Sequence, residues 1–142
     1  MIQITKEFNF EGAHALKGYD GKCSHIHGHS YKMFVTVYGE PISDKDSPKN
    51  GMIIDFSDLK RIVNQTVINK FDHALVLNNS APLAEQINRE YGNVVMVDFT
   101  PTCENLVKHF AELIEERLPS EIVLKSVKLY ETATSFSEWI KQ

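Results

Sequence analysis

Apolar and polar residues alternate along the N-terminal part of the chain, and this alternation constrains the possible folds more than any other feature. The apolar residues at even positions are Ile2, Ile4, Phe8 and Phe10. Because successive side chains of a strand point to opposite faces, the pattern predicts a half-buried β-strand over residues 2 to about 13. The same alternation over residues 31–38 predicts a second strand.

Two later segments show the three- to four-residue periodicity of amphipathic helices instead. The first covers residues 56–69, and Asp55 immediately before it can cap the N-terminus of a helix. For the second, Thr102 is the expected cap, and Pro119 ends the helix. We therefore expect two helices after the two strands.

Two further strands are expected in the second half of the chain, a short one over residues 94–99 and a last one over residues 122–132. The polar segments at residues 40–51 and 78–93 show neither periodicity and are expected to be irregular. Strands that pair locally, with helices between them, predict an α+β fold: an antiparallel β-sheet with two helices on one face. Alternate apolar residues on both faces of the strands suit packing against other subunits.

The composition describes a single domain over residues 1–142 and excludes several classes of protein. The 15 Lys and Arg residues against 19 Asp and Glu give a formal net charge of −4, which excludes a general nucleic-acid binder. No apolar run approaches the roughly 20 residues that a membrane span requires. Two cysteines are too few for a disulfide framework and indicate a reducing compartment. Because a signal peptide's basic and apolar segments are missing, the chain is expected in the cytoplasm.

Three of the six histidines lie within five positions, at residues 25, 27 and 29, and His14 follows the first predicted strand. His27 and His29 are two residues apart, so their imidazoles point to the same side of an extended strand. Gly28 between them permits a close approach of the backbone. With His14 from the neighbouring strand, three nitrogen ligands can converge on one metal ion. Three neutral imidazoles with one open position are typical of a catalytic Zn²⁺ site.

Cys23, four residues before His27, leaves two interpretations open. It can be a fourth ligand that closes the site, or a base or nucleophile beside the metal, because a thiol near a dication and imidazoles carries thiolate character. His25 is ambiguous, since it shares the side of His27 and His29 only if the strand already extends that far; we expect it in a loop. Cys103, in the first turn of a helix, is expected to be a small buried residue.

Six short segments, taken in order, resemble the 6-pyruvoyltetrahydropterin synthase family over nearly the whole chain. They are residues 10–14 (Phe-Glu-Gly-Ala-His), 23–29 (with His-Gly-His), 51–56 (Gly-Met-Ile-Ile-Asp-Phe), 71–73 (Phe-Asp-His), 101–106 (Pro-Thr-Cys-Glu-Asn-Leu) and 130–132 (Tyr-Glu-Thr). Each segment alone is a weak signal, but all six in this order are a strong one. The resemblance implies the tunnelling fold, in which trimers close their sheets into a β-barrel and pair into hexamers, with sites between subunits.

The resemblance also implies a role for each matching residue. The zinc ligands would be His14, His27 and His29. Cys23 would be the general base that takes a proton from the substrate side chain, and Asp72 with His73 would form a proton relay. Glu131 would anchor the pterin ring, because an N–H and an amino group side by side match the two oxygens of a carboxylate. The implied partner is a small-molecule pterin triphosphate.

Three residues separate Cys23 from His27, a spacing that resembles the bacterial branch that makes 6-carboxy-5,6,7,8-tetrahydropterin for queuosine and related deazapurine synthesis. The implied activity is that of a zinc-dependent carbon–carbon lyase that converts 7,8-dihydroneopterin triphosphate and releases acetaldehyde and triphosphate. Two alternatives stay open. One is the pyruvoyl synthase reaction, or cleavage of a sepiapterin-like side chain, by the same residues. The other is a non-catalytic zinc-binding module in which Cys23 is merely a ligand.

Four polar residues near the predicted site keep two interpretations each. Lys17 and Lys22 precede the histidine run and either bind the triphosphate or only solubilise the surface. Thr102 and Glu104 either contact the pterin or serve the helix, Glu104 by complementing its dipole. Two aromatic residues near the C-terminus are expected in packing or in interfaces: Phe136 and Trp139.

Overall fold

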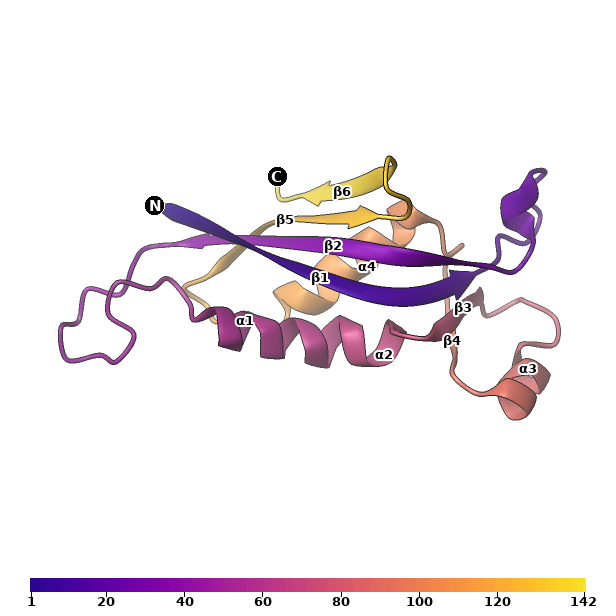
Figure 1. Cartoon of the computed structure of the whole chain (residues 1–142), viewed down its shortest axis with the longest axis horizontal. Helices are drawn as coiled ribbons and strands as arrows, with labels where there is room; N and C mark the ends of the chain where they lie inside the picture. Colours follow the sequence, from indigo (N-terminus) through magenta and orange to yellow (C-terminus); the bar gives the residue numbers. More distant parts are fainter.

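A curled, six-stranded mixed sheet forms the frame of the chain (Figure 1). The computed structural model describes residues 1–142, and the strands follow the spatial order β4-β3-β1-β2-β5-β6. The strands are β1 Ile2–His14, β2 His27–Gly39, β3 Ala74–Asn78, β4 Val94–Val97, β5 Val123–Tyr130 and β6 Phe136–Ile140. The helices are α1 Phe56–Val63, α2 Asn69–Phe71, α3 Ala84–Tyr91 and α4 Cys103–Glu115. None of them is long and apolar enough to span a membrane.

The two longest strands, β1 and β2, form an antiparallel pair of 13 residues each. Their register runs from Ile2 opposite Gly39 to His14 opposite His27. Both predicted strands are confirmed, although the second begins at His27 rather than at residue 31. The loop between them contains only a short 3-10 turn, Lys22–Ser24. Strand pairing, not the loop, therefore determines where His14 and His27 lie relative to each other.

The sheet is mixed because two of its short strands pair in parallel, β3 with β1 and β4 with β3, and β3 is not among the strands expected from the sequence. A parallel pair requires a crossover connection, and α3 supplies it between β3 and β4. The antiparallel arrangement that the sequence predicts holds for β1, β2, β5 and β6. The expectation that residues 78–93 are irregular is wrong at Ala84–Tyr91, which form α3. Ala84 is the only buried residue of this helix, so its apolar periodicity is weak in the sequence.

The last predicted strand corresponds to β5, and a further strand, β6, pairs with it after a turn at residues 131–135. Sequence periodicity does not reveal β6, because it has only five residues and none of them is buried. Trp139 of this strand packs against the core as expected, whereas Phe136 is exposed and lies against the Tyr130 ring, at 4.7 Å between centroids.

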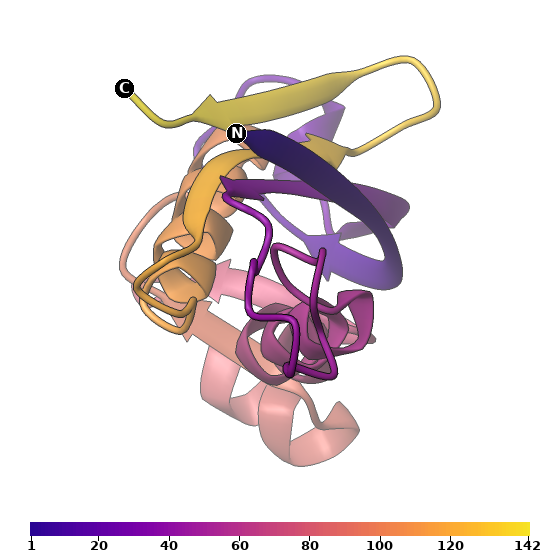
Figure 2. The same cartoon turned by 90° about the vertical axis from the view of Figure 1, so that its left-hand side faces the viewer.

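Helices α1, α2 and α4 cover one face of the sheet, as the end-on view in Figure 2 shows. A π-helical turn, Asn64–Ile68, joins α1 to α2, so the helix predicted over residues 56–69 is confirmed as one continuous unit. Asp55 caps it by accepting a backbone N–H at 2.7 Å, and Thr102 caps α4 by accepting one at 3.2 Å. The predicted α+β class, with helices on one face, is confirmed.

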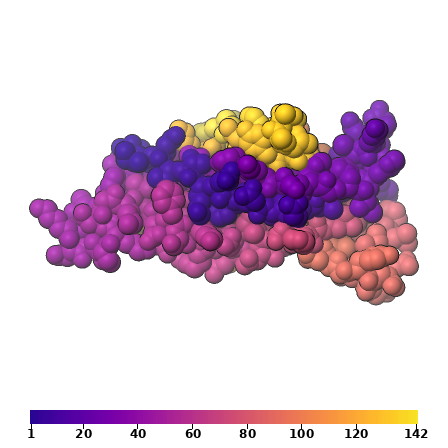
Figure 3. All heavy atoms as spheres, in the orientation of Figure 1, coloured from indigo at the N-terminus to yellow at the C-terminus, as the bar shows by residue number.

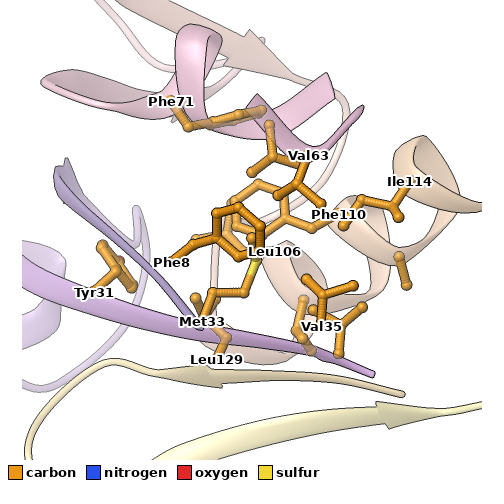
Figure 4. Close-up of a cluster of buried hydrophobic side chains, with 14 of the residues drawn as sticks. Phe8, Tyr31, Met33, Val35, Val63, Phe71, Leu106, Phe110, Ile114 and Leu129 are labelled. Carbon is orange, nitrogen blue, oxygen red and sulfur yellow. The ribbon is translucent and has the colours of Figure 1, made fainter. Parts of the chain in front are cut away.

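A continuous apolar core fills the space between the sheet and these helices (Figure 4). Alternate residues of β1 and β2, among them Phe8 and Met33, meet Phe110 of α4 and Val63 of α1. Burying each such side chain contributes about 1.5–3 kcal/mol. A slip of one residue between β1 and β2 would turn their whole apolar set away from the helices, so the core also maintains the register.

The opposite face of the sheet is open and mainly polar. It carries a hydrogen bond between the Thr5 and Thr36 hydroxyls at 2.8 Å and an ion pair between Lys32 and Glu7 at 3.4 Å. Three aromatic residues of this face form one group, with ring centroids 5.9 and 4.7 Å apart: Phe34, Tyr130 and Phe136. We expected apolar residues on both faces of the strands. On the open face, the apolar residues are mainly those of this aromatic group.

The molecule is elongated, and different segments occupy its two ends (Figure 3). Residues 40–51 form one end, whereas the β1–β2 loop and α3 form the other. Within residues 40–51, the side-chain amide of Asn50 donates hydrogen bonds to the carbonyl oxygens of Ile42, at 3.2 Å, and Asp44, at 2.8 Å. This loop is thus irregular, as predicted, but internally bonded.

Candidate active site and metal centre

Three imidazoles meet at the end of the β1–β2 pair. His14 Nε2 lies 3.0 Å from His27 Nε2 and 3.1 Å from His29 Nε2, and the three ligand atoms all lie within 4.8 Å of one another. The register explains this arrangement, because His14 is directly opposite His27, and His29 lies two residues further along the same face. His14 is almost wholly buried, while the other two are partly exposed. The structure thus brings together the three residues predicted to be metal ligands.

The outer nitrogens of two of these rings orient the inner ones. His14 Nδ1 lies 2.7 Å from the Pro101 carbonyl oxygen, and His27 Nδ1 lies 2.7 Å from the His25 carbonyl oxygen. A carbonyl can only accept a hydrogen bond, so each Nδ1 carries the proton and donates it. In the neutral ring, the lone pair then lies on Nε2 and points into the cluster, the arrangement that metal-ligating histidines show in proteins.

These residues fit a zinc ion. Two nitrogens that each lie about 2.0–2.1 Å from a tetrahedral Zn²⁺ are roughly 3.3 Å apart, close to the 3.0 and 3.1 Å found between the Nε2 atoms of His14 and its two neighbours. Three imidazole donors also suit zinc chemically. The group can therefore hold a metal ion and leave a coordination position open.

The Glu131 carboxylate lies against this cluster, in the turn between β5 and β6. Its Oε1 is 3.1 Å from His14 Nε2 and 3.2 Å from His29 Nε2. It contacts two of the three rings and is not part of the compact three-histidine group. The predicted pterin anchor is thus beside the candidate metal ligands, so a ring held by Glu131 would place its side chain next to them.

Burial and Glu131 together determine the charge preferences of the cluster. The hydrogen bond with His14 holds the pKa of Glu131 below its usual value. Burial disfavours a charged His14, but its hydrogen bonds with Glu131 and Pro101 outweigh this and raise the pKa of His14. For His29, burial prevails and lowers the pKa. An ionised carboxylate beside three imidazoles makes an environment that favours a cation.

Cys23 lies in the short 3-10 turn of the β1–β2 loop, and its side chain is exposed. The Leu16 N–H donates to the Cys23 carbonyl at 2.9 Å, which closes the loop at its base. The thiol is not part of the metal-ligand group, so the structure gives no support to a closed site with four ligands. Cys103 is buried as expected, and burial raises the pKa of its thiol.

Asp72 and His73 form a pair of their own directly after α2. His73 Nδ1 lies 3.0 Å from Asp72 Oδ1, and the same oxygen accepts the Glu11 backbone N–H at 3.0 Å. Neither side chain makes a hydrogen bond to the imidazole cluster. The two predicted halves of the site, metal ligands and proton relay, are therefore separate within one chain.

His73 faces a hollow beside β1 and β3. The hollow has a volume of about 450 Å³, and its lining includes Glu11, Ala13, Ser30 and His73, and also His29, one of the candidate metal ligands. On β1, Glu11 and Ala13 alternate with His14, so they point to the face opposite the buried imidazole. The predicted relay residue His73 thus borders the same hollow as His29, although it makes no hydrogen bond to the imidazoles.

A larger cavity, about 670 Å³, lies at the far end of the sheet around Tyr38 and Ile53. It contains none of the predicted site residues, and Lys49, its one lysine, is paired with Asp55 at 3.6 Å and with Asp58. This cavity is larger than the hollow beside His73, but it has none of the chemical groups predicted for the site. We therefore assign the candidate active site to the histidine end of the sheet.

The remaining residues whose roles the sequence left open make separate local contacts. The Lys17 ammonium group is 3.5 Å from the Ser80 carbonyl oxygen, and Lys22 begins the 3-10 turn. Thr102 caps α4, and Glu104 occupies the first turn of that helix, where it complements the dipole. His25 lies in the loop as expected and contributes its backbone carbonyl to His27.

Sequence reasoning missed Tyr31, which forms a wall of the cluster. Its ring lies 5.5 Å from His29 and stacks on Phe10 at 4.9 Å between centroids. Burial, followed by the charge of Glu131, raises the pKa of the Tyr31 hydroxyl. The signal was present, because Tyr31 continues the alternation of His27 and His29 on the same face.

The sequence model of the 6-pyruvoyl tetrahydropterin synthase family matches residues 3–141. The chain belongs to the 6-pyruvoyl tetrahydropterin synthase family. Two curated relatives of this family member are named 6-carboxy-5,6,7,8-tetrahydropterin synthase. The one from Haemophilus influenzae is 34% identical, with 98% of this chain and 99% of the relative covered. The one from Synechocystis is 36% identical, with 96% and 91% covered.

Solved structures agree with the fold of this family member. The 6-pyruvoyl tetrahydropterin synthase of Plasmodium falciparum superimposes with a TM-score of 0.74 at 19% identity, covering 99% of this chain and 97% of that one. The Caenorhabditis elegans synthase gives 0.69 at 22% identity, covering 99% and 96%. The predicted family and its fold are confirmed.

Proposed function

We propose that this family member converts 7,8-dihydroneopterin triphosphate and one water molecule to 6-carboxy-5,6,7,8-tetrahydropterin, with release of acetaldehyde and triphosphate, in queuosine or related deazapurine synthesis. It is then a zinc-dependent carbon–carbon lyase. The observation that carries the proposal is the convergence of the three imidazole nitrogens with Cys23 outside their group. The names of the relatives at 34% and 36% identity support the carboxy product.

Each polar group has a part in the proposed reaction. Glu131 holds the pterin ring through two charge-assisted hydrogen bonds, beside the imidazoles that it contacts. A zinc ion bound by the three histidines would supply Lewis-acid polarisation of a substrate oxygen. Cys23 takes the proton from the side-chain carbon, and His73, oriented by Asp72, returns a proton elsewhere on the substrate. Elimination of triphosphate follows, and a water molecule then adds to the side-chain carbon next to the ring, so that cleavage of the carbon–carbon bond leaves a carboxyl group there and releases acetaldehyde.

A second copy of the chain completes this site in the proposal. Asp72 and His73 are exposed and make no hydrogen bond to the imidazoles of their own chain, so the relay serves a neighbouring copy. The two exposed edges, β4 and β6, offer unpaired backbone groups for joining sheets into a barrel. The assembly is a homo-oligomer, a trimer or a hexamer.

The products of the purified, zinc-loaded protein test the reaction. Incubated with 7,8-dihydroneopterin triphosphate, it should release acetaldehyde and triphosphate in equal amounts, together with 6-carboxy-5,6,7,8-tetrahydropterin, as measured by chromatography and mass spectrometry. The second candidate is the pyruvoyl reaction, which the names of the family and of the solved neighbours favour. Triphosphate release with a diketo product and no acetaldehyde would replace the carboxy proposal by that alternative.

A further inference from the structure

We propose that Asn93 is a positioning residue for the Asp72–His73 relay, one that holds the backbone of His73 so that its ring stays on the Asp72 carboxylate. This inference rests on the proposed function, in which the relay exchanges protons with the substrate. Asn93 lines the same hollow as His73. It follows Gly92, immediately after the end of α3, in the segment that no periodicity of the sequence distinguishes.

The backbone of His73 is in a conformation that needs support. Its φ is 59°, in the left-handed region that residues other than glycine seldom adopt. One support is the His73 N–H, which donates to the Glu11 carbonyl at 2.6 Å. This bond holds only the amino side of the residue, and the carbonyl side requires a second partner.

Asn93 supplies that partner. Its side-chain Nδ2 donates to the His73 carbonyl at 2.8 Å and lies 3.4 Å from the Asp72 carbonyl. In return, the Leu75 N–H donates to the Asn93 carbonyl at 3.1 Å, so the two segments are bonded to each other on both sides of Ala74. The amide therefore fixes the peptide that follows His73 and thereby the direction of its Cα–Cβ bond.

Asparagine suits this position for two independent reasons. Asn93 itself has a φ of 53°, and asparagine is among the few residues other than glycine that adopt the left-handed region readily. It also carries an N–H₂ donor, which aspartate and glycine lack. The same backbone with aspartate would turn a carboxylate oxygen toward the two carbonyl oxygens, and with glycine it would leave them without this donor.

The relay depends on this clamp because its own side-chain contact is exposed. The His73 side chain is 77% exposed, and its Nδ1 meets a single oxygen of Asp72, which is shared with the Glu11 N–H. Water competes for such a contact, so the backbone must hold the ring in place. Without the clamp, His73 can rotate away from Asp72 and from the substrate that it serves.

Two variants test the proposal, Asn93→Asp, which keeps shape and backbone preference, and Asn93→Gly, which adds no charge. In both, kcat with 7,8-dihydroneopterin triphosphate should fall by about 10- to 100-fold while KM changes less than about twofold, because the relay is misplaced and the binding contacts are retained. The ¹⁵N shifts of the His73 ring should also show loss of the Nδ1–H form that donates to Asp72. The matched control is Asn50→Asp, since Asn50 also bonds two backbone carbonyls but lies at the other end of the molecule.

The outcomes separate this inference from the proposed function. If the wild type does not turn over this substrate, the proposed function fails, and the ring shifts of His73 alone decide the role of Asn93. Unchanged shifts and kcat in both variants would overturn the proposal. A rise in KM at constant kcat would assign Asn93 to substrate binding instead, and an equal loss of kcat in Asn50→Asp would show a general effect on folding.

Discussion

At the scale of single residues, the candidate metal centre is governed by the directions of lone pairs. His14 and His27 both donate hydrogen bonds from Nδ1 to backbone carbonyls. Their Nε2 lone pairs therefore converge, and they repel each other when the rings are neutral. A cation between them removes this repulsion, and the ionised Glu131 nearby adds to its attraction. The metal is therefore expected to stabilise the folded chain as well as to take part in the reaction.

The first prediction contrasts two side chains of the site. Cys23→Ala should keep about one zinc ion per chain and lose turnover by about 10²- to 10⁴-fold, because a general base is removed while the ligands are kept. His27→Ala should instead release most of the zinc, because one of three donors is lost. Zinc content by mass spectrometry and acetaldehyde release by a coupled assay measure the two effects. Cys103→Ala, at a buried thiol that is not part of the ligand group, is the control for Cys23.

Loss of zinc from Cys23→Ala would contradict the assignment of Cys23 as a base. It would favour the alternative in which Cys23 is a fourth ligand of a non-catalytic zinc-binding module.

A second prediction concerns the anchor. Glu131→Gln should weaken pterin binding by about 10- to 100-fold, because an amide cannot accept two charge-assisted hydrogen bonds as a carboxylate does. Zinc should remain bound, since the three imidazoles are unchanged. Fluorescence titration with a pterin that lacks the triphosphate measures the affinity. A slower reaction with unchanged pterin affinity would refute the anchoring role.

Residue types and spacing predicted the histidine group, because side chains that are two residues apart on a strand point to the same face. The same reasoning could not reveal Asn93 or the support from Glu11. Their contributions depend on backbone groups that are distant in sequence, 20 residues away for Asn93 and His73 and 61 for Glu11 and Asp72, about which composition and periodicity say nothing. Tyr31 could have been included, since its position continues the pattern of His27 and His29.

At the scale of secondary-structure elements, α4 is attached to α2 and to the segment after β4 through a partly buried imidazole. The His109 ring packs against Phe71, at 6.1 Å between centroids, and Phe99, at 5.2 Å. Burial first, then the charge of Lys70, lowers the pKa of His109, although the charges of Glu112 and Asp98 oppose this shift. Protonation of His109 therefore works against the packing of these elements.

This packing predicts a pH dependence of stability. Because the pKa of His109 is lower in the folded chain than the ordinary value of 6.5, the unfolded chain binds its proton first, and the free energy of unfolding should fall as the pH falls below 6.5. His109→Gln should reduce this pH dependence, which urea unfolding between pH 7 and 5 measures. His25→Gln, in the exposed loop, should not reduce it. An identical pH dependence in wild type and His109→Gln would contradict the prediction.

Most elements with many buried apolar residues were predicted from the sequence, but β3 was not, although Ala74, Val76 and Leu77 are buried. The strands β1 and β2 and the unit from α1 to α2 have strong periodicity because one face of each meets the core. By contrast, α3 buries only Ala84, and β6 buries no residue, so neither has a periodic signal. The strand β3 was missed because its short apolar run does not alternate, and its parallel pairing depends on where the crossover helices return the chain.

At the scale of the whole molecule, the two halves of the proposed site, the three histidines and the exposed Asp72–His73 pair, are not hydrogen-bonded to each other within one chain. If neighbouring chains complete each other's sites, two inactive variants should restore activity when mixed within one oligomer. Co-expressed Cys23→Ala and His73→Ala chains, isolated as mixed oligomers through two different tags, should regain about a quarter to a third of wild-type activity. About one interface in three of a mixed trimer, and about one in four of a randomly mixed hexamer, combines an intact Cys23 from one chain with an intact His73 from the other.

Each variant alone, purified in the same way, is the control and should remain inactive. Mixed oligomers without activity would place all the reacting groups in one chain.

The long pairing of β1 with β2 also separates two tasks that many sites combine in one segment. The positions of three residues are fixed by the hydrogen bonds between β1 and β2: His14, His27 and His29. Cys23, by contrast, lies in the loop that connects these two strands. Lengthening or shortening that loop would move the Cys23 thiol, while the three histidine nitrogens would stay in place. Evolution can thus alter the outcome of the reaction with a few inserted or deleted residues, and a protein engineer can attempt the same without rebuilding the metal centre.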